Sequence, residues 1–409
     1  MSNLNTPPKD FQALFLDMNS FFASVEQQVQ PPLRGKPVGI APFIGSSGCI
    51  IAASREAKSR GVKIGRVGEM KKICPDIKIV ESRPALYMIY HKEIRKVIES
   101  FTPYFKPLSI DEFVLHLTPR EQSYEAAVKL GQDLKTAIRE RVGDYLTCSV
   151  GIGPSRFLAK MAGERKKPDG LIVVHLSDLS KFYADLSLLD ITGINYRLES
   201  QLNFFKIYSP TDLFNCSLVR LREILNHPGR LWYYRLRGFE VDDSVIGSKT
   251  IGHSHVLPPE LRSRVGAESV IRKLIFKAGK RLREEKYWAT GISVSVNFWD
   301  SGSFAQSKKV ASFCDTQSFS DHVFDLLKKC SWSGRPSYVS VNSFGLIRMA
   351  GEQVSLLLEI EKQKKISKTI DLINDEFGAS TIFPASMFGA RDSAPDRISF
   401  GKPRYEIKF

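Results

Sequence analysis

Two adjacent carboxylates, Asp111 and Glu112, are the residues whose types and spacing point most directly to chemistry. They follow the polar Ser109 and precede an apolar run, residues 113–117, which predicts a buried strand. Neighbouring acids at a strand end repel each other unless a cation lies between them, and hard carboxylate oxygens suit Mg²⁺. The alternative interpretation is a solvated turn before a strand, because Asp-Glu pairs are common.

A third acid stands in a similar position near the N-terminus. Asp17 ends an apolar segment, residues 13–16, which predicts a central strand because both of its faces are apolar. An acid that closes a buried strand is costly unless it is paired or metal-bound. The alternative is that Asp17 caps a helix over residues 20–28. Asp17 and Asp111 can meet only in a fold that places their strands side by side.

Several further segments occur in the order found in the Y-family, or translesion, DNA polymerases. They are residues 13–26, 34–38, 53–65, 109–112, 149–153, 158–162 and 167–170. The sequence resembles this family over nearly the whole chain, and it looks most similar to the bacterial UmuC and DinB-like polymerases. The resemblance implies a multidomain α+β fold, a right-hand polymerase with a ferredoxin-like palm, small fingers, a helical thumb and an α/β little finger.

The length of 409 residues predicts more than one domain, and the resemblance supplies the boundaries. The expected parts are a catalytic palm of residues 1–20 and 84–174, fingers of 21–83, a thumb of 175–240, a linker of 241–248, a DNA-binding little finger of 249–349 and a C-terminal tail of 350–409. The thumb and linker carry 8 Lys and Arg against 9 Asp and Glu, whereas the little finger carries 16 against 8. The excess basic charge of these parts therefore lies in the little finger.

The overall composition narrows the class of partner and the cellular compartment. A net charge of +15 and a pI of about 9.4 favour a polyanion such as DNA. No run of 18 apolar residues occurs, and the N-terminus is polar rather than signal-like, so no membrane association is expected. The six cysteines form no Cys-x-x-Cys pair, which favours reduced thiols and a cytoplasmic, nucleoid-associated protein.

The resemblance also implies roles for the acids and for two aromatic residues. Asp17, Asp111 and Glu112 are the expected catalytic acids. Together with the backbone carbonyl of Met18, they are expected to bind two Mg²⁺ ions, for which Mn²⁺ is a substitute. Phe22, next to the nucleotide-binding Phe21, matches the steric gate that excludes ribonucleotides. The alternative role for Phe22 is core packing.

Three cations are expected to contact the triphosphate of the incoming deoxynucleotide: Arg55, Lys58 and Lys167. Arg55 and Lys58 lie three residues apart, on one face of a predicted helix. The family often has Tyr and Arg at these two positions, and the Lys variant resembles UmuC. The alternatives are a solvated helix face for Arg55 and Lys58, and a helix-dipole contact for Lys167.

Two segments further along the chain depart from the family pattern or match it only over a short stretch. Thr192 and Asn195 interrupt a turn that is usually Pro-Gly-Ile-Gly, which weakens the expected phosphate contact of the thumb. Residues 353–357 resemble a sliding-clamp peptide, with Gln353, Ser355, Leu356 and Leu357 as the clamp-binding residues. The alternative is the start of a helix through residue 360.

The function implied by the resemblance is template-directed DNA synthesis of low fidelity that bypasses DNA damage, as in the SOS response. The implied partners are primer-template DNA, deoxynucleoside triphosphates, a sliding clamp and a UmuD-like accessory subunit. A nucleotidyl cyclase uses similar acids, but it gives no reason for the fingers or for the basic residues 249–349. A catalytically inactive or weak DNA-binding scaffold for repair is the other alternative. Such relatives lose the acids, whereas this chain keeps all three.

Overall fold

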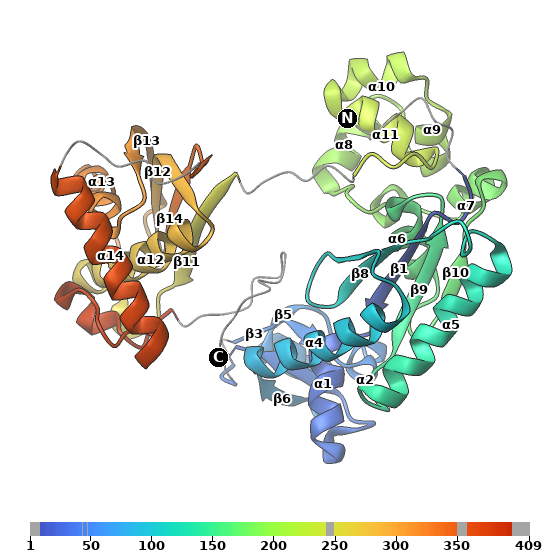
Figure 1. Ribbon diagram of the computed structural model, residues 1–409, viewed down its shortest axis with the longest axis horizontal. Coiled ribbons are helices and arrows are strands. Elements are labelled where there is room, and N and C mark those ends of the chain that lie inside the picture. Colours follow the sequence, from blue (N-terminus) through green and yellow to red (C-terminus); the bar gives the residue numbers. More distant parts are fainter. Residues whose placement is uncertain (1–8, 43, 47, 243–248, 350–357, 395–409) are drawn as a thin grey trace. The chain divides into compact units, whose positions relative to one another are not determined.

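The computed structural model describes residues 9–42, 44–46, 48–242, 249–349 and 358–394 (Figure 1). These residues fall into two compact units, 9–242 and 249–394, which are described separately here. Within the described residues, every helix is too short or too polar to span a bilayer. All six cysteines are described, and none forms a disulfide.

A five-stranded sheet forms the centre of the first unit, with the strand order β10-β9-β1-β8-β7. The strands are β1 Ala13–Met18, β7 Phe105–Pro107, β8 Glu112–His116, β9 Cys148–Gly153 and β10 Leu171–Val173. β1 pairs antiparallel with β8 on one side and with β9 on the other, so the two strands that carry the predicted acids are neighbours. β10 runs parallel to β9.

Helices cover both faces of this sheet. α4 Pro84–Phe101 and α5 Tyr124–Arg141 bury an apolar face against Leu14 and Leu16 of β1. The opposite face, with Phe15, packs on α6 Arg156–Arg165. α6 approaches so closely that a Cβ on Gly151 would lie 1.9 Å from the carbonyl oxygen of Ala159. Because Asp17 and Phe15 are two residues apart in a strand, Asp17 lies on the α6 side of the sheet.

The chain between β1 and α4 begins with α1 Phe21–Val29 and then builds a small α/β subdomain. Its strands are β2 Val38–Ala41, β3 Cys49–Ile50, β4 Ala52–Ala53, β5 Gly65–Arg66 and β6 Lys78–Glu81, and its helices are α2 Arg55–Ser59 and α3 Val67–Ile73. β2 is central between β4 and β6, and the subdomain has its own core around Ile50 and Val67. Ser54 is the N-cap residue of α2, and its side chain accepts a hydrogen bond from Ala57 N–H.

The last part of the first unit is helical. It contains α7 Leu179–Ala184, α8 Tyr196–Phe204, α9 Pro210–Asn215, α10 Leu218–Leu225 and α11 His227–Leu236. Gly193 has a φ of +97°, which favours glycine, and Asn195 caps α8 by accepting a hydrogen bond from Leu198 N–H. The departure from the family pattern at Asn195 therefore has a local structural role.

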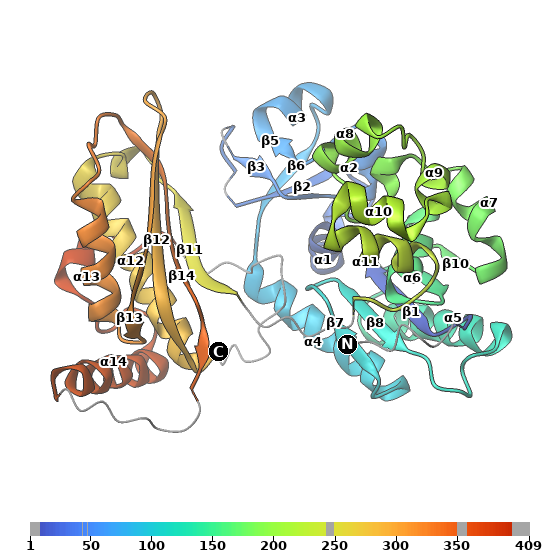
Figure 2. The same cartoon turned by 90° about the horizontal axis from the view of Figure 1, so that it is seen from above.

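The second unit is a five-stranded antiparallel sheet with helices on one face (Figure 2). Its strand order is β11-β14-β12-β13, and the short β15 pairs with β12. The elements are β11 Thr250–Val256, α12 Arg264–Glu284, β12 Tyr287–Phe298, β13 Ser303–Phe313, α13 Thr316–Leu327, β14 Pro336–Phe344, β15 Ile347–Arg348 and α14 Leu358–Phe377. Val294, Val296 and Val341 are buried beneath the helices. The alternation of apolar and polar residues over 292–298 thus matches the two faces of β12.

The open face of this sheet is polar. The register places Ser293 opposite Asn342 and Ser307, and it places Ser295 opposite Ser340. The hydroxyl oxygens of Ser295 and Ser340 lie 3.0 Å apart. This face therefore presents small hydroxyl and amide groups rather than a dense array of cations.

The cations of α12, in contrast, are engaged by the C-terminal segment of the same unit. Arg283 binds both carboxylate oxygens of Asp371 on α14, and Lys280 pairs with Asp375. Lys277 donates to the carbonyl oxygen of Ala394 at 2.9 Å. The basic helix thus serves as an internal attachment for residues that the sequence analysis assigned to a tail.

Candidate active site

The predicted acids lie together at one end of the central sheet of the first unit. Asp17 of β1 is directly opposite Glu112 of β8. The adjacent loop is tied to β1 because Met18 N–H donates to the carbonyl oxygen of Asp111 at 2.9 Å. The alternative role of Asp17 as a helix cap does not apply, since the residue at the N-cap of α1 is Ser20. Strand pairing thus brings together acids that are far apart in the sequence.

Ser109 organises the turn before β8. Its hydroxyl accepts from the backbone N–H of Asp111 at 3.3 Å and of Glu112 at 3.1 Å. The same hydroxyl donates to a carboxylate oxygen of Asp111. His91 of α4 adds a second constraint, because its Nδ1 lies 2.7 Å from the carbonyl oxygen of Ile110. The position of the Asp111 carboxylate is therefore fixed by the folded loop.

Two lysines on the α6 side of the sheet neutralise these acids. Lys167 Nζ lies 2.8 Å from Asp17 Oδ2 and 2.7 Å from Glu164 Oε1. Lys160 Nζ lies 2.6 Å from Glu112 Oε1 and above the ring of Phe15. Lys160 lies within the segment 158–162 that carries the family resemblance, but nothing in its sequence position indicated contact with Glu112.

Burial disfavours the charged forms of Asp17 and Asp111. Burial raises the pKa of Asp17 to about 6, and the negative charge of Asp111 adds to this although Lys167 opposes it. Burial also raises the pKa of Asp111, with Glu112 contributing in the same direction. Burial alone would lower the pKa of Lys167, but the contacts with Asp17 and Glu164 leave it raised.

This donor set fits divalent cations in its chemistry. Within the described part of the chain, no three acidic, His or Cys side chains already stand in the arrangement of a metal site. The raised pKa values of Asp17 and Asp111 come first from burial, and a divalent cation beside these carboxylates would favour their charged forms. Hard carboxylate oxygens are the ligands that Mg²⁺ prefers.

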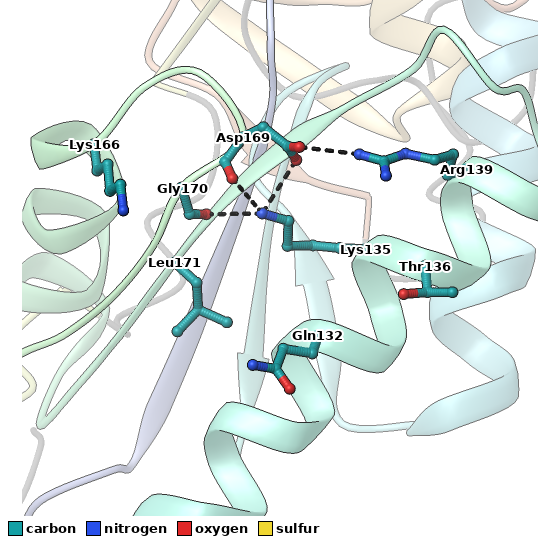
Figure 3. A pocket seen from close by; sticks show the side chains of 8 residues that line it. All are labelled: Gln132, Lys135, Thr136, Arg139, Lys166, Asp169, Gly170 and Leu171. Atoms are coloured by element: carbon teal, nitrogen blue, oxygen red, sulfur yellow. Dashed lines mark hydrogen bonds and ion pairs between the residues drawn. The ribbon is translucent and has the colours of Figure 1, made fainter.

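The turn that follows Lys167 is held in place by side chains of α5 (Figure 3). Asp169 pairs with Lys135 at 3.1 Å and with Arg139 at 2.9 Å, both on α5. Its backbone N–H donates to Asn19 Oδ1 at 2.8 Å, and Asn19 in turn donates to Ser149. Lys135 and Arg139 line the pocket beside this turn. Their ion pairs with Asp169 therefore hold in place the segment that carries Lys167.

The two cations predicted on α2 have different surroundings. The Lys58 side chain is largely exposed, but partial desolvation of its amine, together with the charge of Lys167, lowers its pKa, and Asp17 and Asp111 act in the opposite direction. Lys58 thus shares the electrostatic neighbourhood of the acids. The guanidinium of Arg55 instead lies 5.7 Å from the ring centre of Tyr145, which Arg34 also contacts at 5.2 Å.

Tyr145, just before β9, contacts the small α/β subdomain that contains α2. Its hydroxyl donates to Glu56 Oε1 at 2.9 Å and accepts from Gly35 N–H at 3.0 Å.

Phe21 and Phe22, also expected near the nucleotide, are buried at 3% and 6% exposure in α1, just after β1. Gln353, Ser355, Leu356 and Leu357 lie outside the described residues.

Comparison with known proteins agrees with this arrangement. Residues 16–164 match the profile of the impB/mucB/samB family, and residues 248–367 match the profile of the C-terminal domain of that family. The chain is 30% identical over 394 residues to a DNA polymerase IV of Moorella thermoacetica, covering 93% of this chain and 97% of that protein. It is 29% identical over 380 residues to a DNA polymerase IV of Oceanobacillus iheyensis, covering 90% of each.

Solved structures show the same fold. A Y-family chimera of the polymerases Dbh and Dpo4 has a TM-score of 0.70 at 24% identity, covering 82% of this chain and 99% of the other. An insertion ternary complex of Dbh DNA polymerase has a TM-score of 0.58 at the same identity and coverage. The chain therefore belongs to the impB/mucB/samB family, the Y-family of translesion polymerases, and it is a DNA-directed DNA polymerase with a right-hand fold.

Proposed function

We propose that this polymerase adds deoxynucleotides to a primer 3′-OH by two-metal phosphoryl transfer, with low fidelity and across damaged template bases. The observation that carries the proposal is the pairing of β1 with β8, which sets Asp17 beside Glu112 and Asp111. An inactive DNA-binding scaffold would have no need to keep these three neighbouring acids. The nucleotidyl cyclase alternative explains neither the fingers subdomain nor the second unit.

Each acid has a distinct task in the proposed reaction. Asp17 and Asp111 would hold two Mg²⁺ ions, with Glu112 and the carbonyl of Met18 each as a further ligand of one ion. Such ions would supply activation of the primer hydroxyl and neutralisation of the leaving pyrophosphate. With Asp17 binding a cation, the ammonium of Lys167 would be available for phosphate oxygens.

In this proposal the five-stranded sheet is the palm, β2–β6 belong to the fingers, the helices α7–α11 form the thumb and the second unit is the little finger. This second unit also includes the described residues 358–394, which were predicted to be part of a tail. Two similar Dbh structures are ternary complexes. This supports primer-template DNA and a deoxynucleotide as the ligands of this chain. On the polar open face, the hydroxyl groups of Ser295 and Ser340 would donate hydrogen bonds to DNA phosphates. The peptide 353–357 and a UmuD-like subunit stay predictions for recruitment.

Metal binding can be measured directly, without turnover. We expect Mn²⁺ to bind the full chain with deoxynucleotide present, and the free Mn²⁺ signal in electron paramagnetic resonance reports it. Asp17→Asn removes one of the charges expected to hold the metal, and it should weaken Mn²⁺ binding about tenfold or more. Changes to groups that bind a metal or orient its ligands commonly lower metal affinity by that much. Asp133→Asn, at an exposed position of α5, is the control. Equal Mn²⁺ affinity in all three proteins would contradict the metal assignment.

The different surroundings of Lys58 and Arg55 lead to a second prediction. Lys58→Ala should raise the KM for deoxynucleotide about tenfold, because a charge-assisted contact contributes roughly 1.5–3 kcal/mol. Arg55→Ala should change this KM about threefold or less and lower stability by about 0.5–1 kcal/mol, through loss of the Tyr145 stacking. Steady-state kinetics and thermal unfolding of both variants separate the two roles. A larger rise in KM for Arg55→Ala would return Arg55 to the triphosphate.

A further inference from the structure

The ring of Phe22 does not stand alone in the core. It stacks face to face on the ring of Tyr87, with the ring centres 4.4 Å apart and an interplanar angle of 13°. Tyr87 belongs to α4 and is 1% exposed, while Phe22 is the second residue of α1. The two helices contact each other in this region. The face of Phe22 against Tyr87 is therefore backed by a fully buried side chain.

Tyr87 is fixed at its other end by a buried carboxylate. Its hydroxyl donates to Glu26 Oε1 at 2.9 Å, and Glu26 is fully buried. Arg83 binds both carboxylate oxygens of Glu26, through Nε at 3.0 Å and through Nη2. Gln30 adds a hydrogen bond at 2.9 Å. A buried carboxylate with these partners is satisfied, and it holds Tyr87 because losing that donor would leave the charge less well paired.

The four side chains interlock through the helical repeat. Phe22 and Glu26 are four residues apart in α1, and Arg83 and Tyr87 are four residues apart at the start of α4. Residues with this spacing lie on the same face of a helix. Tyr87 therefore contacts α1 at two points, the ring of Phe22 and the carboxylate of Glu26, and this prevents the Tyr87 ring from moving away from Phe22.

We propose that Tyr87, held by Glu26 and Arg83, is a positioning residue that sets how strongly this polymerase discriminates between deoxyribonucleotides and ribonucleotides. The inference rests on the proposed role of Phe22 as the steric gate. A gate excludes a 2′-OH only if its ring cannot retreat from the sugar. The stacked Tyr87 ring, anchored at its hydroxyl, removes the space into which Phe22 would move.

Two substitutions at Tyr87 separate the anchor from the stacking. Tyr87→Phe keeps the ring but loses the bond to Glu26, and it should lower the ratio of kcat/KM for dNTP over rNTP about threefold. Tyr87→Leu also removes the stacking, and it should lower the ratio about tenfold. Both variants keep Phe22. The ratio is the readout because a partly unfolded sample lowers both rates equally, so general destabilisation cancels.

Tyr183→Phe is the matched control. Tyr183 is also fully buried, and its hydroxyl donates to the carbonyl oxygen of Leu236 at 2.8 Å, but it belongs to α7. This variant should lose stability without a change in the sugar ratio. An equal change in Tyr183→Phe and Tyr87→Phe would overturn the inference, because the effect would then come from weakened packing in general.

Phe22→Ala distinguishes failure of this inference from failure of the gate. If Phe22→Ala lowers the sugar ratio and both Tyr87 variants leave it within twofold of the wild type, Tyr87 is only a structural residue. If Phe22→Ala itself leaves the ratio unchanged, the gate assignment is wrong and the inference falls with it. Should Tyr87→Leu fail to fold, Tyr87→Phe decides alone.

Discussion

Asp111→Asn should lower the kcat/KM for primer extension about a thousandfold, or roughly 4 kcal/mol of transition-state stabilisation, because it removes a charge that holds both metal ions. The substitution keeps the size of the side chain. The amide oxygen of the new residue can still accept the hydrogen bond that the Ser109 hydroxyl donates to Asp111. Single-turnover extension of a labelled primer measures the loss. Retention of more than about a tenth of the wild-type rate would contradict the assignment of Asp111.

Unfolding does not provide an alternative explanation for that loss. Burial raises the pKa of Asp111, which means that the folded state disfavours the charged carboxylate. A neutral amide at this position therefore removes an unfavourable charge rather than a stabilising one. We expect the melting temperature of Asp111→Asn to be equal to or above that of the wild type, and its DNA affinity to be retained.

Phe22→Ala should lower the preference for deoxyribonucleotides over ribonucleotides about a hundredfold, since the pocket that rejects the 2′-OH loses its wall. The buried ring also contributes to the core, so the variant should lose about 3–5 kcal/mol of stability. Comparing kcat/KM for the two sugars in the same sample separates these effects. An unchanged ratio would leave Phe22 as a core residue, the alternative that the sequence allows.

Local patterns predicted the elements that carry the site. The apolar run that follows Glu112 lies in β8, and the apolar segment before Asp17 is the central strand β1. In both cases the hydrophobic period and the flanking residues hold the needed information. The adjacency of the Asp17 and Asp111 strands came from the family resemblance, because strand pairing across so long a separation has no local signal.

Contacts between distant polar residues were beyond such patterns. Glu26 looks like an exposed helix residue, and its burial depends on Arg83 and Tyr87, which lie 57 and 61 residues away. The same holds for Lys160 and Glu112, 48 residues apart. Their pairing depends on how α6 packs over the sheet, which no neighbouring residue reveals.

The basic helix α12 shows the same limit with a different consequence. The excess basic charge of residues 249–349 favours contact with DNA, whereas Arg283 and Lys280 of this helix pair with Asp371 and Asp375 of α14. The net positive charge of residues 249–349 is therefore partly neutralised by residues beyond that range. Charge counts over a chosen segment cannot show this, because they omit the helix that folds back onto it.

The most direct test of the account is one-nucleotide primer extension by the wild-type chain with Mg²⁺, on undamaged templates that differ in the base opposite the insertion site and on a template with an abasic site. The account predicts that the complementary deoxynucleotide is added on each undamaged template, that the abasic template is also extended, and that EDTA abolishes both reactions. DNA binding without extension on any template would contradict it and would favour the inactive scaffold.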